Sequence, residues 1–192
     1  MAQKLFLQFS TERVPVPVEC QTPGVGHTDH VTRVPVGNGN YVLLTSKAGF
    51  ERLIAQNEVQ PDALVVSFVP AIVPPGVQQL SLVFSDSQES YDQMKDAIHE
   101  HVPRIAKEAL TGRKIIVHCH AGASRSVTFV IAILMNAQKL RGEEVITFSD
   151  ANQFIRDLRI DPNNPECHLN MTSVNLAFCQ LLTFYHQELT RE

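Results

Sequence analysis

The sequence predicts an α/β fold with a central, mostly parallel sheet of about four to five strands flanked by helices. From Tyr41 onward, short apolar runs alternate with amphipathic segments, which is the pattern of strands connected by helices. The chain has 192 residues, of which 44% are hydrophobic and 19% charged, so it can bury one sizeable core and differs from a disordered chain or a coiled coil. We therefore expect one globular domain with one appendage.

The appendage is predicted at the start of the chain, where glycine and proline are frequent. The run Val14–Val18 alternates valine with proline and can only be extended. We predict that residues 1–40 form an N-terminal extended arm laid over a domain of residues 41–192, with a loose tail as the alternative. The residues concerned are Pro15, Pro17, Pro23, Pro35, Gly24, Gly26, Gly37 and Gly39.

Within residues 41–192, strands and helices are predicted in a regular order. Each strand is a short apolar or β-branched run, and each helix carries apolar residues at steps of three and four. Strands are expected at 41–44, 63–69, 77–84 and 114–118. Helices are expected at 46–56, 91–111, 125–140, 149–158 and 171–185. Pro103 lies inside the second helix, which we expect to kink or restart there.

Charge and hydropathy limit the classes of function. With 16 basic and 20 acidic residues the net charge is −4, which argues against a generally basic nucleic-acid-binding protein. The longest apolar run, Phe129–Met135, is too short to span a bilayer, and residues 1–10 lack the apolar core of a signal peptide. We expect a cytoplasmic protein, with the nucleus as an alternative, that binds neither membrane nor nucleic acid and keeps its four cysteines as free thiols.

The residues that can carry chemistry lie where the fourth predicted strand ends. Cys119 follows that strand, and five residues separate it from Arg125, which opens a helix that is apolar nearly all round. Such a loop can turn its backbone N–H groups toward one point, and the helix N-terminus adds positive potential there. The guanidinium of Arg125 matches two oxygens of a phosphate. The sequence therefore predicts a cradle for a tetrahedral oxyanion, with a Cys119 thiolate as nucleophile.

The local charge agrees with an anion site. Between Ala109 and Gly142 there is no acidic residue, although the whole chain is acidic. The same stretch contains five basic residues, Arg113, Lys114, Arg125, Lys139 and Arg141.

The segment His118–Ser126, HCHAGASRS, resembles the phosphate-binding loop of cysteine-based protein phosphatases. It matches the pattern HCxAGxSRS of the dual-specificity branch at every fixed position. Residues 132–135 are similar to the branch's AYLM, and residues 159–163 resemble its segment ending in Pro-Asn. The resemblance covers about residues 40–187. It implies that residues 41–192 are a dual-specificity-phosphatase-like catalytic domain, without metal or cofactor, that works through a phosphocysteine.

The resemblance also implies roles for single residues. Cys119 and Arg125 are expected to be catalytic, and Ser126 to donate a hydrogen bond to the cysteine sulfur. A general acid is needed to protonate the leaving oxygen, and Asp86 occupies the family's place for it, with Asp92 and Glu89 as weaker candidates. The phosphate-binding loop comprises His120, Ala121, Gly122, Ala123, Ser124 and Arg125.

The two histidines beside the nucleophile are open to other interpretations. His118 precedes Cys119 on the strand, so we expect its side chain to point away from the phosphate and to support the loop by hydrogen bonds. His120 could face substrate or solvent. A metal site at His118, Cys119 and His120 is disfavoured because three adjacent residues do not easily surround one ion.

The predicted function is hydrolysis of phosphoproteins at phosphotyrosine and at phosphoserine or phosphothreonine. The loop holds no lysine, which disfavours an inositol phospholipid as substrate. The alternatives are a pseudophosphatase that only binds phosphorylated partners, and a phosphatase of phosphoinositide, RNA or glycan phosphate. A sulfurtransferase or an arsenate reductase fits the loop pattern less well.

Overall fold

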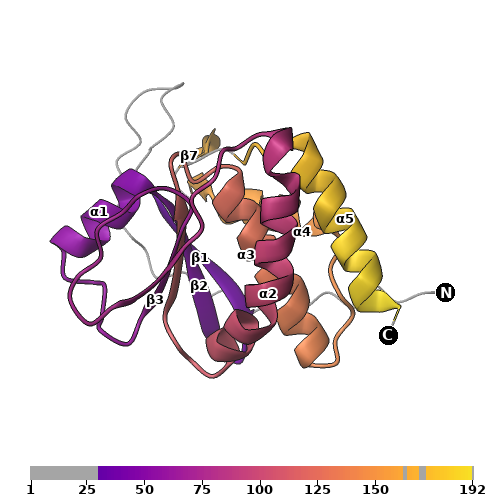
Figure 1. The fold of residues 1–192 in the computed structure, drawn as a ribbon, viewed down its shortest axis with the longest axis horizontal. Helices are drawn as coiled ribbons and strands as arrows, with labels where there is room; N and C mark the ends of the chain where they lie inside the picture. Colours follow the sequence, from indigo (N-terminus) through magenta and orange to yellow (C-terminus); the bar gives the residue numbers. More distant parts are fainter. Residues whose placement is uncertain (1–29, 162–163, 169–171, 192) are drawn as a thin grey trace.

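The computed structural model describes residues 30–161, 164–168 and 172–191. A five-stranded sheet in the order β1-β2-β5-β3-β4 forms its centre, and helices cover both faces (Figure 1), which confirms the predicted α/β class. The strands of this sheet are β1 (Val31–Gly37), β2 (Asn40–Ser46), β3 (Leu64–Ser67), β4 (Gln78–Ser81) and β5 (Ile115–Cys119). The helices are α1 (Lys47–Ala55), a short 3-10 turn η1 (Gln88–Ser90), α2 (Tyr91–Leu110), α3 (Arg125–Leu140), α4 (Phe148–Asp157) and α5 (Leu176–Thr190).

The central strand β5 places the candidate site at one edge of the sheet. It is buried along its whole length and lies between β2 and β3, to both of which it is parallel. Cys119 at its end pairs with Ser46 of β2, and His118 pairs with Ser67 of β3. The carboxyl ends of the three strands therefore meet at the same edge, where ligands bind in open α/β sheets.

Residues 31–40 are not part of an extended arm, so that part of the predicted boundary is wrong. Val31–Gly37 is the antiparallel edge strand β1, whose alternate residues Thr32, Val34 and Val36 are buried. The turn to β2 has positive φ at Asn38 and Gly39, as two-residue hairpins with an Asn-Gly sequence require. That dipeptide was the sequence signal for the hairpin. The remainder of the predicted arm, residues 1–29, lies outside the described residues.

The helix α2 runs without a break through Pro103, contrary to the predicted restart. Pro103 is exposed, whereas Val102 and Ile105 beside it are buried. The carbonyl group that loses its helical partner therefore lies on the solvent side, where water can satisfy it, while the buried face keeps its packing. This packing offsets the missing hydrogen bond.

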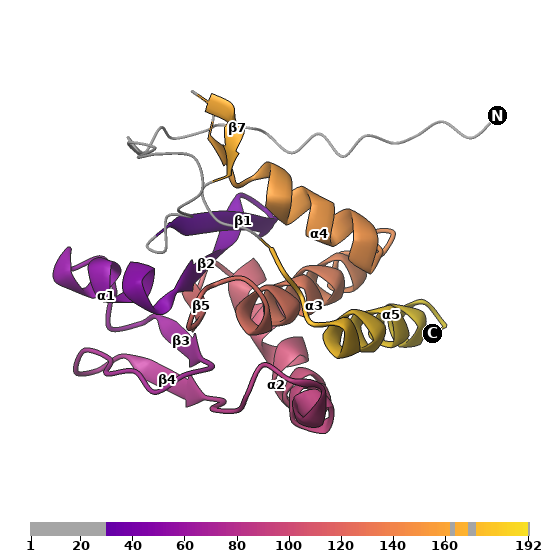
Figure 2. The same ribbon diagram turned by 90° about the horizontal axis from the view of Figure 1, so that it is seen from above.

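The helix α3 forms the middle of the larger core. Every residue from Ser126 to Gln138 is buried, because the sheet lies on one side and α2, α4 and α5 surround the others (Figure 2). Its N-terminus follows the loop after β5, so the core fixes the helix end that faces the candidate site. On the opposite face of the sheet, α1 covers a smaller apolar cluster that includes Phe50 and Ile116.

The end of the chain departs from prediction in two places. A small antiparallel hairpin, β6 (Ile160–Asp161) with β7 (Asn164–His168), follows α4 and was not predicted. The last helix was predicted from residue 171 but begins at Leu176, because the Asn175 side chain caps it by accepting a hydrogen bond from the Ala177 N–H at 2.9 Å.

Candidate active site

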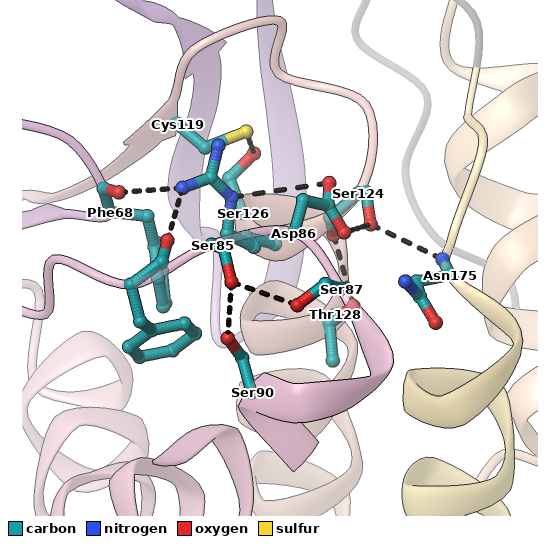
Figure 3. Close-up of polar contacts among 12 residues, drawn as sticks. Phe68, Ser85, Asp86, Ser87, Ser90, Cys119, Ser124, Ser126, Thr128 and Asn175 are labelled. Atoms are coloured by element: carbon teal, nitrogen blue, oxygen red, sulfur yellow. Dashed lines mark hydrogen bonds and ion pairs between the residues drawn. The ribbon is translucent and has the colours of Figure 1, made fainter.

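Cys119 lies at the carboxyl end of β5 with its side chain toward the larger core. It is 2% exposed. Its sulfur accepts a hydrogen bond from the Gly122 N–H at 3.2 Å. The sulfur also lies 3.1 Å from the Ser126 hydroxyl oxygen (Figure 3). Both groups can donate a hydrogen bond to the sulfur. The geometry thus places two donors around the sulfur at the start of the loop.

Gly122 makes the tight curvature of the loop possible for two reasons. Its φ of +70° is a conformation that residues with a Cβ adopt only at a cost. A Cβ at this position would also lie 2.8 Å from the Ser46 nitrogen and 2.9 Å from the Thr45 carbonyl carbon. The loop therefore packs directly against the backbone of β2, which only glycine allows.

Arg125 projects from the first turn of α3 and is held by two neighbouring loops. Its Nη1 group donates to the carbonyl oxygens of Phe68 at 2.9 Å and Phe84 at 2.6 Å. These residues follow β3 and β4, so the guanidinium joins the two loops at the carboxyl edge of the sheet. The side chain is 12% exposed, and its Nε lies 3.9 Å from the Asp86 carboxylate.

Of the three candidate acids, Asp86 is the one whose side chain contacts the phosphate-binding loop among the described residues. It lies between β4 and η1. The strand β4 ends at Ser81, three residues before its predicted end at residue 84. Its carboxylate accepts a hydrogen bond from the Ser124 hydroxyl at 2.8 Å (Figure 3). Asp92 lies in the first turn of α2 and Glu89 in η1, and neither has such a contact among the described residues.

Ser124 joins the acid to the end of the chain, a link that the sequence did not reveal. While its hydroxyl donates to Asp86, the same oxygen accepts a hydrogen bond from the Asn175 N–H at 3.2 Å. Its carbonyl accepts from the Thr128 N–H at 2.8 Å and the Thr128 hydroxyl at 3.0 Å. Ser124 therefore fixes the segment that carries Asp86, residues 82–87 (the acid loop), relative to both α3 and α5.

Three further serines organise the segment around Asp86. The Ser85 hydroxyl lies 2.8 Å from the hydroxyls of both Ser87 and Ser90 (Figure 3). Ser90 is buried at the start of α2. The network ties the acid loop to the helix that follows it.

His118 faces the opposite side of the sheet from Cys119, as alternation along a strand requires. Its ring stacks on Phe50 of α1 with centroids 4.4 Å apart. Its Nε2 lies 2.8 Å from the Ser67 hydroxyl of β3, so this contact joins two neighbouring strands. The supporting role of His118 for the loop stays a prediction. Burial lowers the pKa of His118 to about 4, and the imidazole is neutral near pH 7.

The remaining loop residues are held by backbone contacts. His120 is exposed, and its carbonyl accepts a hydrogen bond from the Lys47 N–H at 3.2 Å. The Ala123 carbonyl accepts from the Ser173 N–H at 2.9 Å. Ala121 is exposed, at the outer side of the loop.

The structure also bears on metal binding and membrane insertion. In the ranges that the structure describes, no three or more His, Cys, Asp or Glu side chains are grouped to hold a metal ion. No described helix combines the length and the apolar character needed to cross a bilayer.

Comparisons with known proteins identify the family. Residues 44–169 match the family model described as "Dual specificity phosphatase, catalytic domain". Human dual specificity protein phosphatase 12 is 35% identical over 74 residues, a match that covers 36% of this chain and only 21% of that protein. The fold is similar to human DUSP28, with a TM-score of 0.59, 19% identity, and coverage of 82% of this chain and 95% of that one.

A second structure gives the same result for the fold. A mouse putative dual specificity phosphatase, solved in complex with zinc tungstate, is 20% identical with a TM-score of 0.57. The alignment covers 89% of this chain and 94% of the mouse chain. At these identities the likeness concerns the fold alone, whereas the family model spans most of the chain. The loop geometry and the family match together establish that this chain belongs to the dual-specificity phosphatase catalytic-domain family.

Proposed function

We propose that the protein hydrolyses phosphorylated proteins, at phosphotyrosine and at phosphoserine or phosphothreonine, through a phosphocysteine at Cys119. One observation carries the proposal: the Cys119 sulfur lies within hydrogen-bond reach of the Gly122 N–H and the Ser126 hydroxyl. Arg125 and Asp86 complete the set, with a cation and a carboxylate 3.9 Å apart. A nucleophile, oxyanion donors and a proton donor are the groups that two-step phosphoryl transfer needs.

In the first step the Cys119 thiolate attacks the phosphorus atom. The S–P bond forms and the bond from phosphorus to the substrate oxygen breaks. Asp86, in its protonated form, gives its proton to that leaving oxygen. The N–H groups of the loop and the Arg125 guanidinium hold the negative charge on the equatorial oxygens.

In the second step water attacks the phosphocysteine. The Asp86 carboxylate accepts a proton from the water, the S–P bond breaks, and inorganic phosphate leaves. The hydroxyl of Ser126 and the N–H of Gly122 donate to the departing sulfur, which makes the thiolate a better leaving group. The enzyme returns to its starting form.

The loop composition supports phosphoproteins over the other substrates considered. His120, Ala121, Ala123 and Ser124 provide no lysine that would bind the further phosphates of an inositol lipid. A thiolate nucleophile also needs reducing surroundings, which agrees with the cytoplasm or the nucleus as its site of action.

The proposal is tested by incubating the protein with phosphopeptides that carry tyrosine, serine or threonine phosphate. We expect release of inorganic phosphate, and after acid quenching a peptide containing Cys119 with the added mass of one phosphoryl group. Binding of phosphopeptides without phosphate release would instead indicate a pseudophosphatase. Release from a phosphoinositide or an RNA phosphate, but from no phosphopeptide, would assign a different substrate class.

The role of Asp86 predicts a change in the pH profile. In the wild type the rate should fall at high pH, where the carboxyl group has lost the proton that it must donate. Asp86→Asn should lower kcat by roughly 10²-fold for a substrate with a poor leaving group and remove the high-pH fall. The measurement is kcat against pH with a phenyl phosphate.

Asp92→Asn is the matched control, because this carboxylate lies in the first turn of α2. It should leave both kcat and the shape of the profile unchanged. If Asp92→Asn flattens the profile and Asp86→Asn does not, the acid has been assigned to the wrong residue.

A further inference from the structure

Arg159 is a buried arginine close to the loop that the proposed mechanism leaves without a role. It lies two residues after the end of α4, and its side chain is 0% exposed. Among the fully buried side chains of the described residues, that of Arg159 is one of the largest. A buried guanidinium needs hydrogen-bond partners for its donors, so its partners show what the residue holds in place.

Two of these partners join the edge of the sheet to the phosphate-binding loop. The Arg159 Nε donates to the Thr32 hydroxyl of β1 at 2.9 Å, and its Nη2 donates to the Gly122 carbonyl at 3.0 Å. Thr32 is itself 2% exposed, so the first bond lies in the interior. The planar guanidinium therefore fixes the distance between β1 and the loop.

The bond to Gly122 constrains the direction of a loop N–H group. A peptide unit is planar, and its C=O and N–H point in opposite directions. Holding the Gly122 carbonyl therefore also orients the Ala123 N–H. On its other side, Gly122 packs against the backbone of Thr45 and Ser46. The peptide is thus held between β2 and Arg159.

The charge of Arg159 is retained in the interior. Burial lowers the pKa of Arg159 to about 10, and the interaction with Cys119 acts in the opposite direction, so the guanidinium is a cation near neutral pH. Other ionisable groups at this edge of the sheet are Arg125 on α3, Asp86 in the acid loop, neutral His118 on β5 and Lys47 at the start of α1.

We propose that Arg159 is a positioning residue that holds the Gly122 peptide in the conformation that binds phosphate. Thr32 is the anchor that orients the guanidinium. The inference rests on the proposed function, since it concerns the loop that would bind the phosphoryl group. Neither residue touches the substrate in this role, because both act through the Gly122 carbonyl.

The test measures binding of sodium tungstate, a tetrahedral oxyanion, by calorimetry well below the melting temperature of each variant. Arg159→Lys keeps the charge but cannot bridge Thr32 and Gly122 in one planar group, and should weaken tungstate binding about tenfold. Thr32→Val preserves the shape of the side chain and removes only the anchor, with an expected loss of about threefold. Turnover of an aryl phosphate should show kcat lowered by similar factors.

Arg156→Lys is the matched control. Arg156 lies three residues earlier, on α4, and its side chain makes no hydrogen bond or ion pair within the described parts of the chain. If Arg159→Lys or Thr32→Val is folded and binds tungstate as tightly as Arg156→Lys, the positioning role is wrong. If Arg159→Lys does not fold, Thr32→Val decides. Failure of the wild type itself to bind tungstate would instead contradict the proposed function.

Discussion

Replacement of Cys119 by serine is expected to lower kcat on the order of 10⁵-fold, the scale that follows removal of a covalent nucleophile. A serine hydroxyl is a far weaker acid than a thiol, so near neutral pH it does not supply an anion that can attack phosphorus. The Ser126 hydroxyl and Gly122 N–H, both within 3.2 Å of the sulfur, cannot compensate for this difference. Hydrolysis of para-nitrophenyl phosphate measures the effect.

The same substitution should leave phosphate binding in place, because the loop N–H groups and Arg125 are unchanged. Tungstate should therefore bind to Cys119→Ser with an affinity near that of the wild type. Cys179→Ser is the control: this second free thiol lies on α5, where burial raises its pKa, so its loss should not affect turnover. Equal rates for wild type and Cys119→Ser would refute a phosphocysteine mechanism.

Replacement of Gly122 by alanine is expected to lower kcat/KM by roughly 10²–10³-fold, because it displaces the oxyanion donors of the loop. The new Cβ would lie 2.8 Å from the Ser46 nitrogen, and the backbone of β2 cannot move aside as a flexible side chain can. The variant should also lose at least 1–2 kcal/mol of unfolding free energy, roughly the cost of a left-handed conformation for a residue with a Cβ. Chemical denaturation and phosphatase assays measure the two effects.

Gly142→Ala separates the two causes. Gly142 has the same φ of +70°, but a Cβ there meets nothing within 4 Å. This variant should show about 1–2 kcal/mol of destabilisation with unchanged turnover. If Gly122→Ala behaves in the same way, close packing against β2 is not what the loop needs.

Local patterns predicted the elements that build the centre of the site. Three of these elements follow one another in sequence: the strand that ends at Cys119, the loop, and the helix that begins at Arg125. The strand and the helix are apolar because both are buried in the core. This arrangement predicted the oxyanion loop, and the resemblance to the phosphatase family implied its chemistry. The structure places Asp86 beside the same loop, although the two are 38 residues apart at the Ser124 contact.

Boundaries that depend on tertiary contacts were predicted less well. The proline and glycine of residues 31–37 are typical of an arm, whereas the alternate burial of Thr32, Val34 and Val36 belongs to the edge strand β1. The helix α2 continues through Pro103 because packing on its buried face offsets one lost hydrogen bond. In both cases the local sequence preferences were weak or in conflict, and packing against neighbouring elements determined the structure.

By itself, the sequence determined the α/β class and the presence of an oxyanion loop between a buried strand and a buried helix. These features follow from hydrophobic periodicity and from backbone geometry over a few residues. Only the tertiary structure could reveal that Arg159 joins Gly122 to Thr32, partners 37 and 127 residues away, and that Ser124 joins Asp86 to Asn175. Such contacts form because buried donors must find acceptors, and which acceptors are near is decided by how the elements pack.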